Sequence, residues 1–201
     1  VNITNINITG DSRVGGLIGW NDGVNIIDSY STGTITGQSD RVGGLVGVNS
    51  GDIIDSYSTS KVTGQSDRVG GLIGFNSNGA DVMDSYATGD VSGIGRVGGL
   101  IGNINGGNIT NTYSIGNVTG DSDVGGLSGI SFGTITDSYW NTETSNQSTS
   151  AGNATGLTTA EMTGSAAETN MVGFDFTSTW STVLESDSDA SSDGYPILQD
   201  V

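Results

Sequence analysis

The stretch "SDRVGGLVGVNSGDIIDSYSTSKVTGQ", residues 39–65, is followed at once by "SDRVGGLIGFNSNGADVMDSYATGDVSG", residues 66–93, which repeats it closely. The motif "VGGL" begins at intervals of 28, 27, 28 and 27 residues, at Val14, Val42, Val69, Val97 and Val124. A tyrosine keeps the same step, at Tyr30, Tyr57, Tyr86, Tyr113 and Tyr139. A fixed period of this length over five copies indicates a solenoid or another repeat array.

Each unit contains three short runs rich in Val, Ile, Thr and Tyr, separated by Gly, Asn, Asp and Ser. This composition predicts strands joined by tight turns, and no apolar pattern has helical spacing. One unit alone buries almost nothing, so we expect the units to stack at about 4.8 Å per rung. We therefore predict an all-β fold, a three-sided right-handed parallel β-solenoid (β-helix) of about five rungs over residues 1–139. A propeller is less suitable because its blades need about 40 residues each.

The interior of the stack is predicted from positions whose chemistry changes little between units. The predicted interior columns are Leu17, Leu45, Leu72, Leu100 and Leu127, then Ile26, Ile53, Val82, Ile109 and Ile135, and also Ile35, Val62, Val91 and Val118. The column Ile27, Ile54, Met83, Thr110 and Thr136 mixes apolar with polar residues, so we expect it to be partly exposed. Each Gly-Gly pair is expected where a Cβ would clash with the next rung or where φ must be positive.

At these residues the chain resembles the GLUG-motif repeats, named for the Gly-Leu-Gly pattern that stands here as "GGLIG" (15–19) and "GGLVG" (43–47). Such repeats are similar to segments of bacterial and archaeal surface proteins, among them large adhesins, haemagglutinin-like proteins and non-catalytic regions of IgA-cleaving metallopeptidases. The resemblance covers residues 3–139, and the tail also looks like the segment that follows these repeats. It implies a β-solenoid at a cell surface and implies no reaction.

The two ends of the array differ from its middle. Residues 140–201 break the period, and we expect them to form a cap packed on the last rung, because an end rung exposes strand edges and core. Large apolar groups for this cap come from Trp140, Phe174, Phe176, Trp180, Tyr195, Ile197 and Leu198. The first unit, "VNITNINITG", is only part of a rung and predicts an open edge. We expect preceding sequence or another subunit to cover it, so end-to-end self-association is the expected interaction.

Composition narrows the class of function. The net charge is −17, from 22 acidic and five basic residues, which disfavours binding to nucleic acid or an anionic membrane. Such acidity suits a high-salt environment, where charge repulsion is screened. The chain has no Cys and no His, and no apolar run reaches the roughly 20 residues of a transmembrane helix. We expect a secreted protein, extracellular or on the cell surface.

Modification and metal sites are predicted at two kinds of motif. Six N-x-[ST] sequons make N-glycosylation possible at Asn2, Asn7, Asn108, Asn117, Asn146 and Asn153. The acidic stretch "DASSDGYPILQD" has spacings that resemble a calcium loop, with the candidate ligands Asp189, Ser191, Asp193 and Asp200. An acidic surface loop is the preferred interpretation, and apart from calcium no cofactor is expected.

Three further patterns suggest chemistry, and each has a simpler structural interpretation. "GISFG" (129–133) spells a nucleophile elbow around Ser131, but without His it is better explained as a degenerate repeat. A further column, the aspartate column, contains Asp28, Asp55, Asp84, Asn111 and Asp137. Its carboxylates are spaced like the catalytic pair of some glycosidases, but all of them have nearly the same environment, so we expect them to cap turns. Arg13, Arg41, Arg68 and Arg96 are expected to form a charge ladder with Asp40 and Asp67, and the tyrosines a packing ladder rather than a sugar-stacking face.

The preferred function is therefore a non-enzymatic extracellular structural protein, either the stalk of a surface adhesin or the subunit of a self-assembling filament. Its expected partners are further copies, other surface proteins or glycans. The alternative is a carbohydrate-binding or polysaccharide-degrading β-helix, which would need a groove with unlike carboxylates or basic residues. Ice binding would need a flat regular threonine array, and the runs before Gly37, Gly64, Gly93 and Gly120 are too irregular for it.

Overall fold

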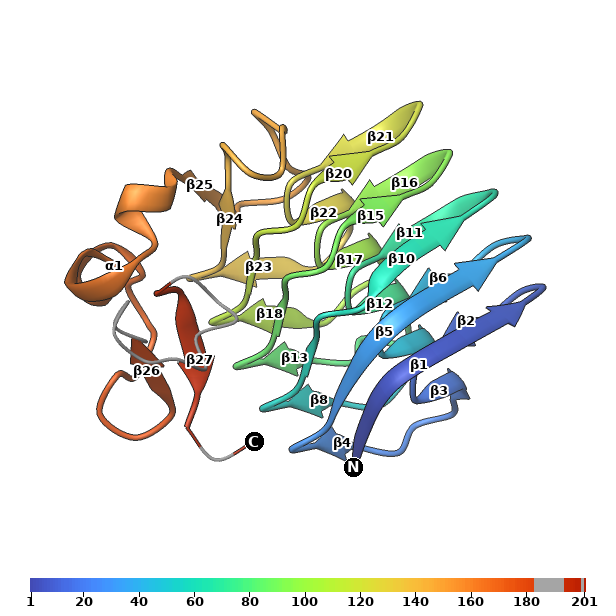
Figure 1. Cartoon of the computed structure of the whole chain (residues 1–201), viewed down its shortest axis with the longest axis horizontal. Coiled ribbons are helices and arrows are strands. Elements are labelled where there is room, and N and C mark those ends of the chain that lie inside the picture. Colours follow the sequence, from blue (N-terminus) through green and yellow to red (C-terminus); the bar gives the residue numbers. More distant parts are fainter. Residues whose placement is uncertain (183–193, 200) are drawn as a thin grey trace.

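The computed structural model describes residues 1–182, 194–199 and 201. The chain winds into a parallel β-solenoid of about five turns, which confirms the predicted fold class (Figure 1). We call each turn a rung. Strands of successive rungs lie side by side in four parallel sheets, and the tail after residue 157 lies beside the stack.

Two of the sheets come from the "VGGL" half of each rung. The first, the glycine sheet, contains the five strands β2 (Val14–Gly15), β6 (Val42–Gly43), β11 (Asp67–Gly70), β16 (Gly95–Gly98) and β21 (Ser122–Gly125). The second, the asparagine sheet, contains β3 (Ile18–Asn21), β7 (Val46–Asn49), β12 (Ile73–Asn76), β17 (Ile101–Ile104) and β22 (Ser128–Ser131). The single apolar run read from the sequence is thus bent into two strands.

The other two sheets come from the tyrosine half. The isoleucine sheet contains β4 (Ile26–Ile27), β8 (Ile53–Ile54), β13 (Val82–Met83), β18 (Asn108–Thr110) and β23 (Thr134–Thr136). The tyrosine sheet contains β1 (Asn2–Gly10), β5 (Tyr30–Gly37), β9 (Tyr57–Ser58), β14 (Tyr86–Ala87), β19 (Tyr113–Ser114), β24 (Tyr139–Asn141) and β25 (Thr155–Leu157), together with β10 (Lys61–Gly64), β15 (Val91–Ser92) and β20 (Val118–Thr119).

A full rung such as the second therefore has five short strands, where the sequence predicted three runs on three sides. The extra corners are made by residues with positive φ. The "IIDSY" run breaks at Asp55 (φ 48°), and its counterparts in the other rungs have φ between 44° and 52°. Asp and Asn tolerate this left-handed region better than most residues, so the repeated Asp marks a corner between sheets.

A second positive-φ corner falls on the residue that precedes each "VGG": an arginine in the first four rungs, such as Arg41 at 66° and Arg68 at 62°, and Asp123 at 49° in the fifth. The glycine pairs themselves do not have positive φ, so that part of the expectation is wrong. Glycine is required at these positions because a Cβ there would clash with the backbone of the next rung. A Cβ on Gly43 would lie 2.7 Å from the backbone nitrogen of Gly74, and one on Gly44 would lie 2.0 Å from the carbonyl oxygen of Gly71.

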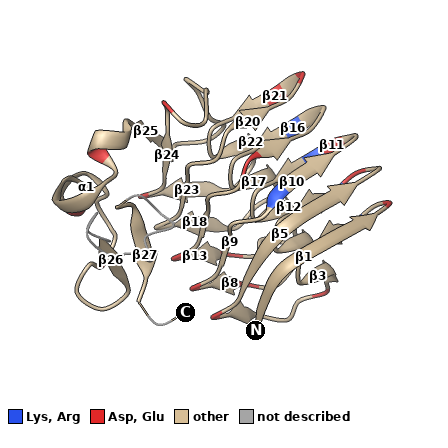
Figure 2. Cartoon of the chain, viewed as in Figure 1, with Lys and Arg blue, Asp and Glu red and all other residues tan. Residues whose placement is uncertain are grey.

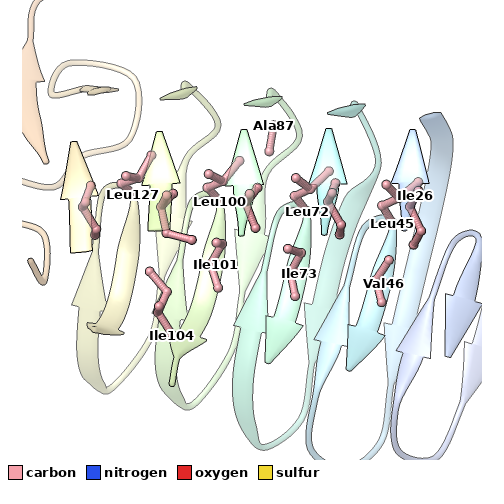
Figure 3. Packing of buried hydrophobic residues seen from close by; sticks show 14 of the residues in the cluster. Ile26, Leu45, Val46, Leu72, Ile73, Ala87, Leu100, Ile101, Ile104 and Leu127 are labelled. Carbon is pink, nitrogen blue, oxygen red and sulfur yellow. The ribbon is translucent and has the colours of Figure 1, made fainter. Parts of the chain in front are cut away.

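The core is built from the columns predicted to face inward (Figure 3). The leucines of the second to fifth rungs are at most 1% exposed, whereas Leu17 in the first rung is only partly buried. The column that begins at Ile26 and the column that begins at Ile35 are buried in every rung. Ile27 is 48% exposed, and the other members of its column are half-buried or exposed.

A column of small residues lies opposite the glycine pairs inside the solenoid. Its members are Ser31, Ser58, Ala87 and Ser114, each directly after a tyrosine, and Trp140 in the last rung. A Cβ on Gly44 would lie 2.3 Å from the Ser58 hydroxyl, so the inner side chain in a middle rung must be small. Trp140 fits only because no complete rung lies beyond it.

The tail has two parts that pack in different places, whereas the sequence predicted a single cap on the last rung. Residues 142–157 follow the edge of the fifth rung, where Ser145 and Thr149 accept backbone hydrogen bonds from Val118 and Gly126, and β25 pairs with β24. Trp140 joins the core there and is 6% exposed. The remainder forms η1 (Thr159–Glu161), α1 (Gly164–Asn170) and the antiparallel pair β26 (Trp180–Thr182) and β27 (Pro196–Leu198), and it packs on the side of the solenoid.

Candidate functional site

The tyrosines form a column on the side of the solenoid, which we call the tyrosine ladder: Tyr30, Tyr57, Tyr86 and Tyr113 are stacked ring on ring, and Tyr139 continues the column in the fifth rung. The ring centroids of Tyr30 and Tyr57 are 4.6 Å apart, those of Tyr57 and Tyr86 are 4.7 Å apart, and those of Tyr86 and Tyr113 are 5.0 Å apart. The planes in each pair are tilted by at most 11°. The spacing equals that of the strands, so the backbone register sets the stacking.

The tail covers the tyrosine ladder with large apolar side chains. Trp180 is fully buried and contacts Tyr86 and Tyr113, each at a centroid distance of 5.9 Å, and Phe174 packs edge-on against Tyr139. The hydroxyl of Tyr113 donates to the carbonyl oxygen of Pro196. Large apolar groups that the sequence assigned to an end cap are therefore used on a lateral face.

Burial of the tyrosine ladder changes its acid–base behaviour. Desolvation, with a smaller contribution from Tyr30, raises the pKa of Tyr57 to about 12. Burial also raises the pKa of Tyr86 and Tyr113 further above the ordinary value. The phenols of Tyr57, Tyr86 and Tyr113 therefore stay protonated at a pH where an exposed phenol would ionise, which suits hydrogen-bond donation and apolar packing.

Part of the tyrosine ladder lines a groove of about 420 Å³ next to the last residues of the tail. Tyr30, Tyr57 and Tyr86 alternate there with a threonine column, Thr4, Thr32, Thr59 and Thr88. Ile197, Leu198 and Val201 close one side. The groove is a seam between the solenoid and its own tail.

The aspartate column lies at the corner between the isoleucine and tyrosine sheets, where Figure 2 shows a row of acidic residues. Burial, and then the charges of Asp84 and Asp28, raise the pKa of the Asp55 carboxyl. Asp84 accepts hydrogen bonds from the Trp180 indole nitrogen at 3.2 Å and from the Asn111 amide at 3.1 Å. These contacts are structural, and within the described residues no cluster of three acidic groups could hold a metal ion.

Three of the four arginines, Arg41, Arg68 and Arg96, form the charge ladder expected from the sequence, whereas Arg13 makes no ion pair with a described residue. The Asp40 carboxylate contacts the guanidinium groups of Arg41 at 3.3 Å and Arg68 at 3.2 Å. Asp67 contacts those of Arg68 at 3.5 Å and Arg96 at 2.9 Å. Each carboxylate therefore lies between two like charges and offsets their repulsion.

The other candidate residues are the sequon asparagines, Ser131 and the proposed calcium ligands. Of the sequon asparagines, Asn2, Asn7, Asn108, Asn146 and Asn153 are exposed, while Asn117 is half-buried. Ser131 is half-buried and donates a long hydrogen bond, 3.4 Å, to the Gly133 carbonyl oxygen. The proposed calcium ligands, Asp189, Ser191, Asp193 and Asp200, lie outside the described residues.

The first rung is the open end of the stack. β2, β3 and β4 are the outermost strands of their sheets, and β1 pairs only with β5, so no described strand pairs with their outer edges. Trp20 and Ile27 of this rung are 56% and 48% exposed. The fifth rung differs, because residues 145–157 supply partners to β20, β22 and β24.

The fold defines the class of protein: a repeat protein whose rungs form a parallel β-solenoid. A family model described as the GLUG motif matches residues 10–36, 39–63 and 66–92, which are the first three complete repeats. The chain is therefore a GLUG-repeat β-solenoid protein, as the resemblance in the sequence implied.

Two known proteins are similar to the chain as a whole. Halomucin of Haloquadratum walsbyi (strain DSM 16790 / HBSQ001) is 36% identical over 223 residues, covering 98% of this chain, although the chain spans only 2% of halomucin. The crystal structure of a candidate immunoglobulin A1 protease from Bacteroides ovatus matches with a TM-score of 0.73 at 21% identity, over all of this chain and 68% of the other. That likeness concerns the fold alone. No helix among the residues described here has the length and hydropathy needed to cross a membrane.

Proposed function

We propose that this chain is a non-enzymatic structural module of an extracellular or cell-surface repeat protein. The observation that carries the proposal is the asymmetry of the stack: β2, β3 and β4 of the first rung have no described partner on their outer edges, whereas residues 145–157 supply partners to β20, β22 and β24 of the fifth. The similarity to a small part of halomucin supports a role as one segment of a much longer surface protein. In such a protein the rungs act as a rigid spacer, because each rung is hydrogen-bonded to its neighbours along its length.

The uniform columns support the non-enzymatic part of the proposal. Asp28, Asp55 and Asp84 have the same backbone conformation and share one corner, whereas catalytic carboxylates need unlike environments. The raised pKa of Asp55 arises from its burial and from Asp84 and Asp28, its own column neighbours. The arginines are largely paired with carboxylates of the adjacent rungs.

The open first rung is the proposed attachment point. Its unpaired strand edges and the exposed Ile27 side chain fit another rung, which runs parallel when a longer chain contributes it and antiparallel when a second copy docks by its own first rung. Trp140 and residues 145–157 obstruct much of the opposite end, so the first rung is the more open of the two. This favours the stalk interpretation over an endless filament, and it predicts that isolated copies pair by their first rungs.

Light scattering combined with electron microscopy over a concentration series tests this proposal. We expect dimers at high concentration, with the two solenoids joined end to end. Ile27→Lys places a charge on the open rung and should keep the protein monomeric. Ile94→Lys is the matched control, since Ile94 is 50% exposed but lies away from that rung, and it should still dimerise. A strictly monomeric wild type would refute pairing of copies and leave attachment within a longer chain.

The exposed sequon asparagines support the further proposal that the native protein is glycosylated. Asn117 is the exception, because it is half-buried and its side-chain oxygen accepts a hydrogen bond from Asn146. Mass spectrometry of peptides from the native source would test this. We expect glycan at Asn2, Asn7, Asn108, Asn146 or Asn153, and unmodified asparagine at all of them would refute it.

A further inference from the structure

A second groove, of about 310 Å³, runs across the outer side of the asparagine sheet over the first three rungs. Its floor is the outward column Trp20, Val48 and Phe75, which are in register on β3, β7 and β12. Neither the tyrosine ladder nor the tail contributes to it. It is therefore separate from the seam under the tail.

The floor presents aromatic surface to solvent. Trp20 is 56% exposed, whereas the other two tryptophans, Trp140 and Trp180, are 6% and 0% exposed. Phe75 is half-buried two rungs away, and the smaller Val48 separates the two rings. The ring-bearing positions are thus about 9.6 Å apart, twice the strand spacing. Exposed aromatic groups in a concave, polar-rimmed surface are typical of binding sites.

One wall of the groove is positively charged. The Arg13 guanidinium lies over the Trp20 ring, 4.9 Å from its centre, and those of Arg41 and Arg68 lie over the Phe75 ring, 5.9 and 5.4 Å from its centre. Arg13 is exposed and makes no ion pair with any described residue, unlike Arg41, Arg68 and Arg96. In a chain of net charge −17, a guanidinium left without a carboxylate is available for an anionic group of a ligand.

The other wall carries hydroxyl and amide groups. The Ser50 and Ser77 hydroxyls are 2.9 Å apart, and the Asn78 amide donates to Ser50 at 3.2 Å. Asn105 and the exposed Asp22 complete this side. These groups lie in adjacent rungs and form a row of donors and acceptors parallel to the aromatic floor.

We propose that this groove binds an oligosaccharide that carries acidic groups, lying along the stack across the first three rungs. The apolar faces of its sugar rings pack on the surface of Trp20 and Phe75 that the guanidinium groups leave exposed, its hydroxyls bond to the Ser and Asn wall, and a carboxylate pairs with Arg13. A nucleic acid is disfavoured by the net charge, and a lipid by the polar walls. This site is distinct from the aspartate and tyrosine columns, and it binds ligand whether or not the first rung attaches to another.

Fluorescence titration with two matched sugars tests the proposal. Trp20 is the exposed tryptophan, so ligand in the groove should change the emission of this residue. The probes are β-1,4-linked hexamers of mannuronic acid and of mannose, which differ in their carboxylates. We expect saturable binding of the acidic hexamer, weaker binding of the neutral one, and loss of affinity for the acidic hexamer as salt increases.

Variants separate the contributions of the two walls and the floor. Trp20→Ala, followed by calorimetry, should raise the Kd for both hexamers at least about tenfold, equivalent to about 1.4 kcal/mol. Arg13→Gln should remove the preference for the acidic hexamer and leave binding of the neutral one unchanged. Phe132→Ala is the control, because Phe132 is 74% exposed but lies outside the groove, and it should bind like the wild type.

Three results would overturn the proposal. The first is the absence of saturable binding to either hexamer by a protein whose circular dichroism shows it to be folded. The second is binding that Trp20→Ala leaves unchanged or that Phe132→Ala weakens equally. The third is an emission change that depends on protein concentration rather than sugar, which would assign the groove to a second copy. Binding is measured at protein concentrations where light scattering shows monomers, so failure of end-to-end pairing does not affect the outcome.

Discussion

The solenoid and the lateral tail are stabilised in different ways. In the solenoid, backbone hydrogen bonds join residues one period apart, and each interior column repeats one kind of residue. The described part of the tail after residue 157 has one short helix, one 3-10 turn and one antiparallel pair, and it is held by a few large side chains against the tyrosine ladder. Each rung of the solenoid is therefore stabilised by its neighbouring rungs, whereas the tail is stabilised by the surface of the solenoid.

The tolerance of the two regions to substitution should differ accordingly. Between rungs, backbone approaches backbone, and a clash there cannot be relieved by rotation of a side chain. In the tail, side chains pack on side chains, and a truncation leaves a cavity that can partly collapse. Four measurements test this difference between the solenoid and the tail.

The largest effect is expected from Gly44→Val in the second rung. The new Cβ would lie 2.0 Å from the Gly71 carbonyl oxygen, and separation of the rungs there should cost at least about 3 kcal/mol. Thermal unfolding followed by far-UV circular dichroism should show a large loss of stability or no folded protein. Gly95→Ser is the matched control, because Gly95 pairs with Asp67 and Ser122, which already carry side chains there. A wild-type melting temperature for Gly44→Val would contradict the rung geometry.

Trp180→Ala should release the tail and leave the solenoid folded. Removal of a fully buried tryptophan typically costs 3–5 kcal/mol, and here the loss falls on the contacts with Tyr86, Tyr113 and Phe174. Limited proteolysis should remove the tail rapidly, while the far-UV spectrum of the solenoid persists. Val172→Ala, at a position 64% exposed, should leave the tail resistant. Simultaneous loss of both regions would mean that the solenoid also depends on the tail.

Salt should stabilise the tail more than the solenoid. Every Lys and Arg lies in residues 1–157, so the tail has acidic residues without any basic ones. Residues 1–157 are also net negative, because their acidic residues outnumber these basic ones. The negative tail therefore docks on a negative body. The Debye length falls from about 10 Å at 0.1 M salt to about 3 Å at 1 M, which weakens this repulsion. We expect the temperature at which protease removes the tail to rise more steeply with sodium chloride than the melting temperature of the solenoid. A tail equally susceptible at both salt concentrations would contradict this and the proposed adaptation to high salt.

The smallest effect is expected from Asp55→Asn, which copies the fourth rung, where Asn111 occupies the same corner. The folded-state pKa of Asp55 is raised, so its charged form opposes folding above that pKa, and the opposition disappears as the pH falls. The variant should melt within about 2 °C above the wild type at pH 7, because the corner is partly solvated. The difference should vanish near pH 3. Asp121→Asn, at an exposed position, controls for net charge, and an equal gain from it would contradict the column effect.

The repeat made the solenoid predictable from the sequence. Positions that kept one chemistry across units, such as Leu45, Leu72 and Leu100, are buried in the structure. The corners were harder to predict, because nothing in "IIDSY" distinguishes a straight strand from two strands joined at Asp55. The same holds for the arginines, since positive φ at Arg41 or Arg68 runs against residue preference and follows from the tight bend before the glycine pair.

The surfaces were less predictable than the interior. The sequence identified aromatic groups in the tail, but single residues such as Trp180 carry no periodic signal that tells a lateral face from an end. No repeated chemistry marks Trp20 and Phe75 in the sequence, because their column also contains Val48, Asn103 and Ile130. A column whose residues change from rung to rung is also where a repeat protein can acquire specificity.

The single tryptophan in the inner column of small residues has a consequence for how such proteins change length. A duplicated or deleted unit anywhere before Trp140 preserves the contact between each glycine pair and its small neighbour, and it changes the height of the molecule by about 4.8 Å. No unit can be added after it without replacing the tryptophan. Trp140 thus blocks the addition of a further rung, and recombination can vary the number of rungs before it while the last rung stays the same.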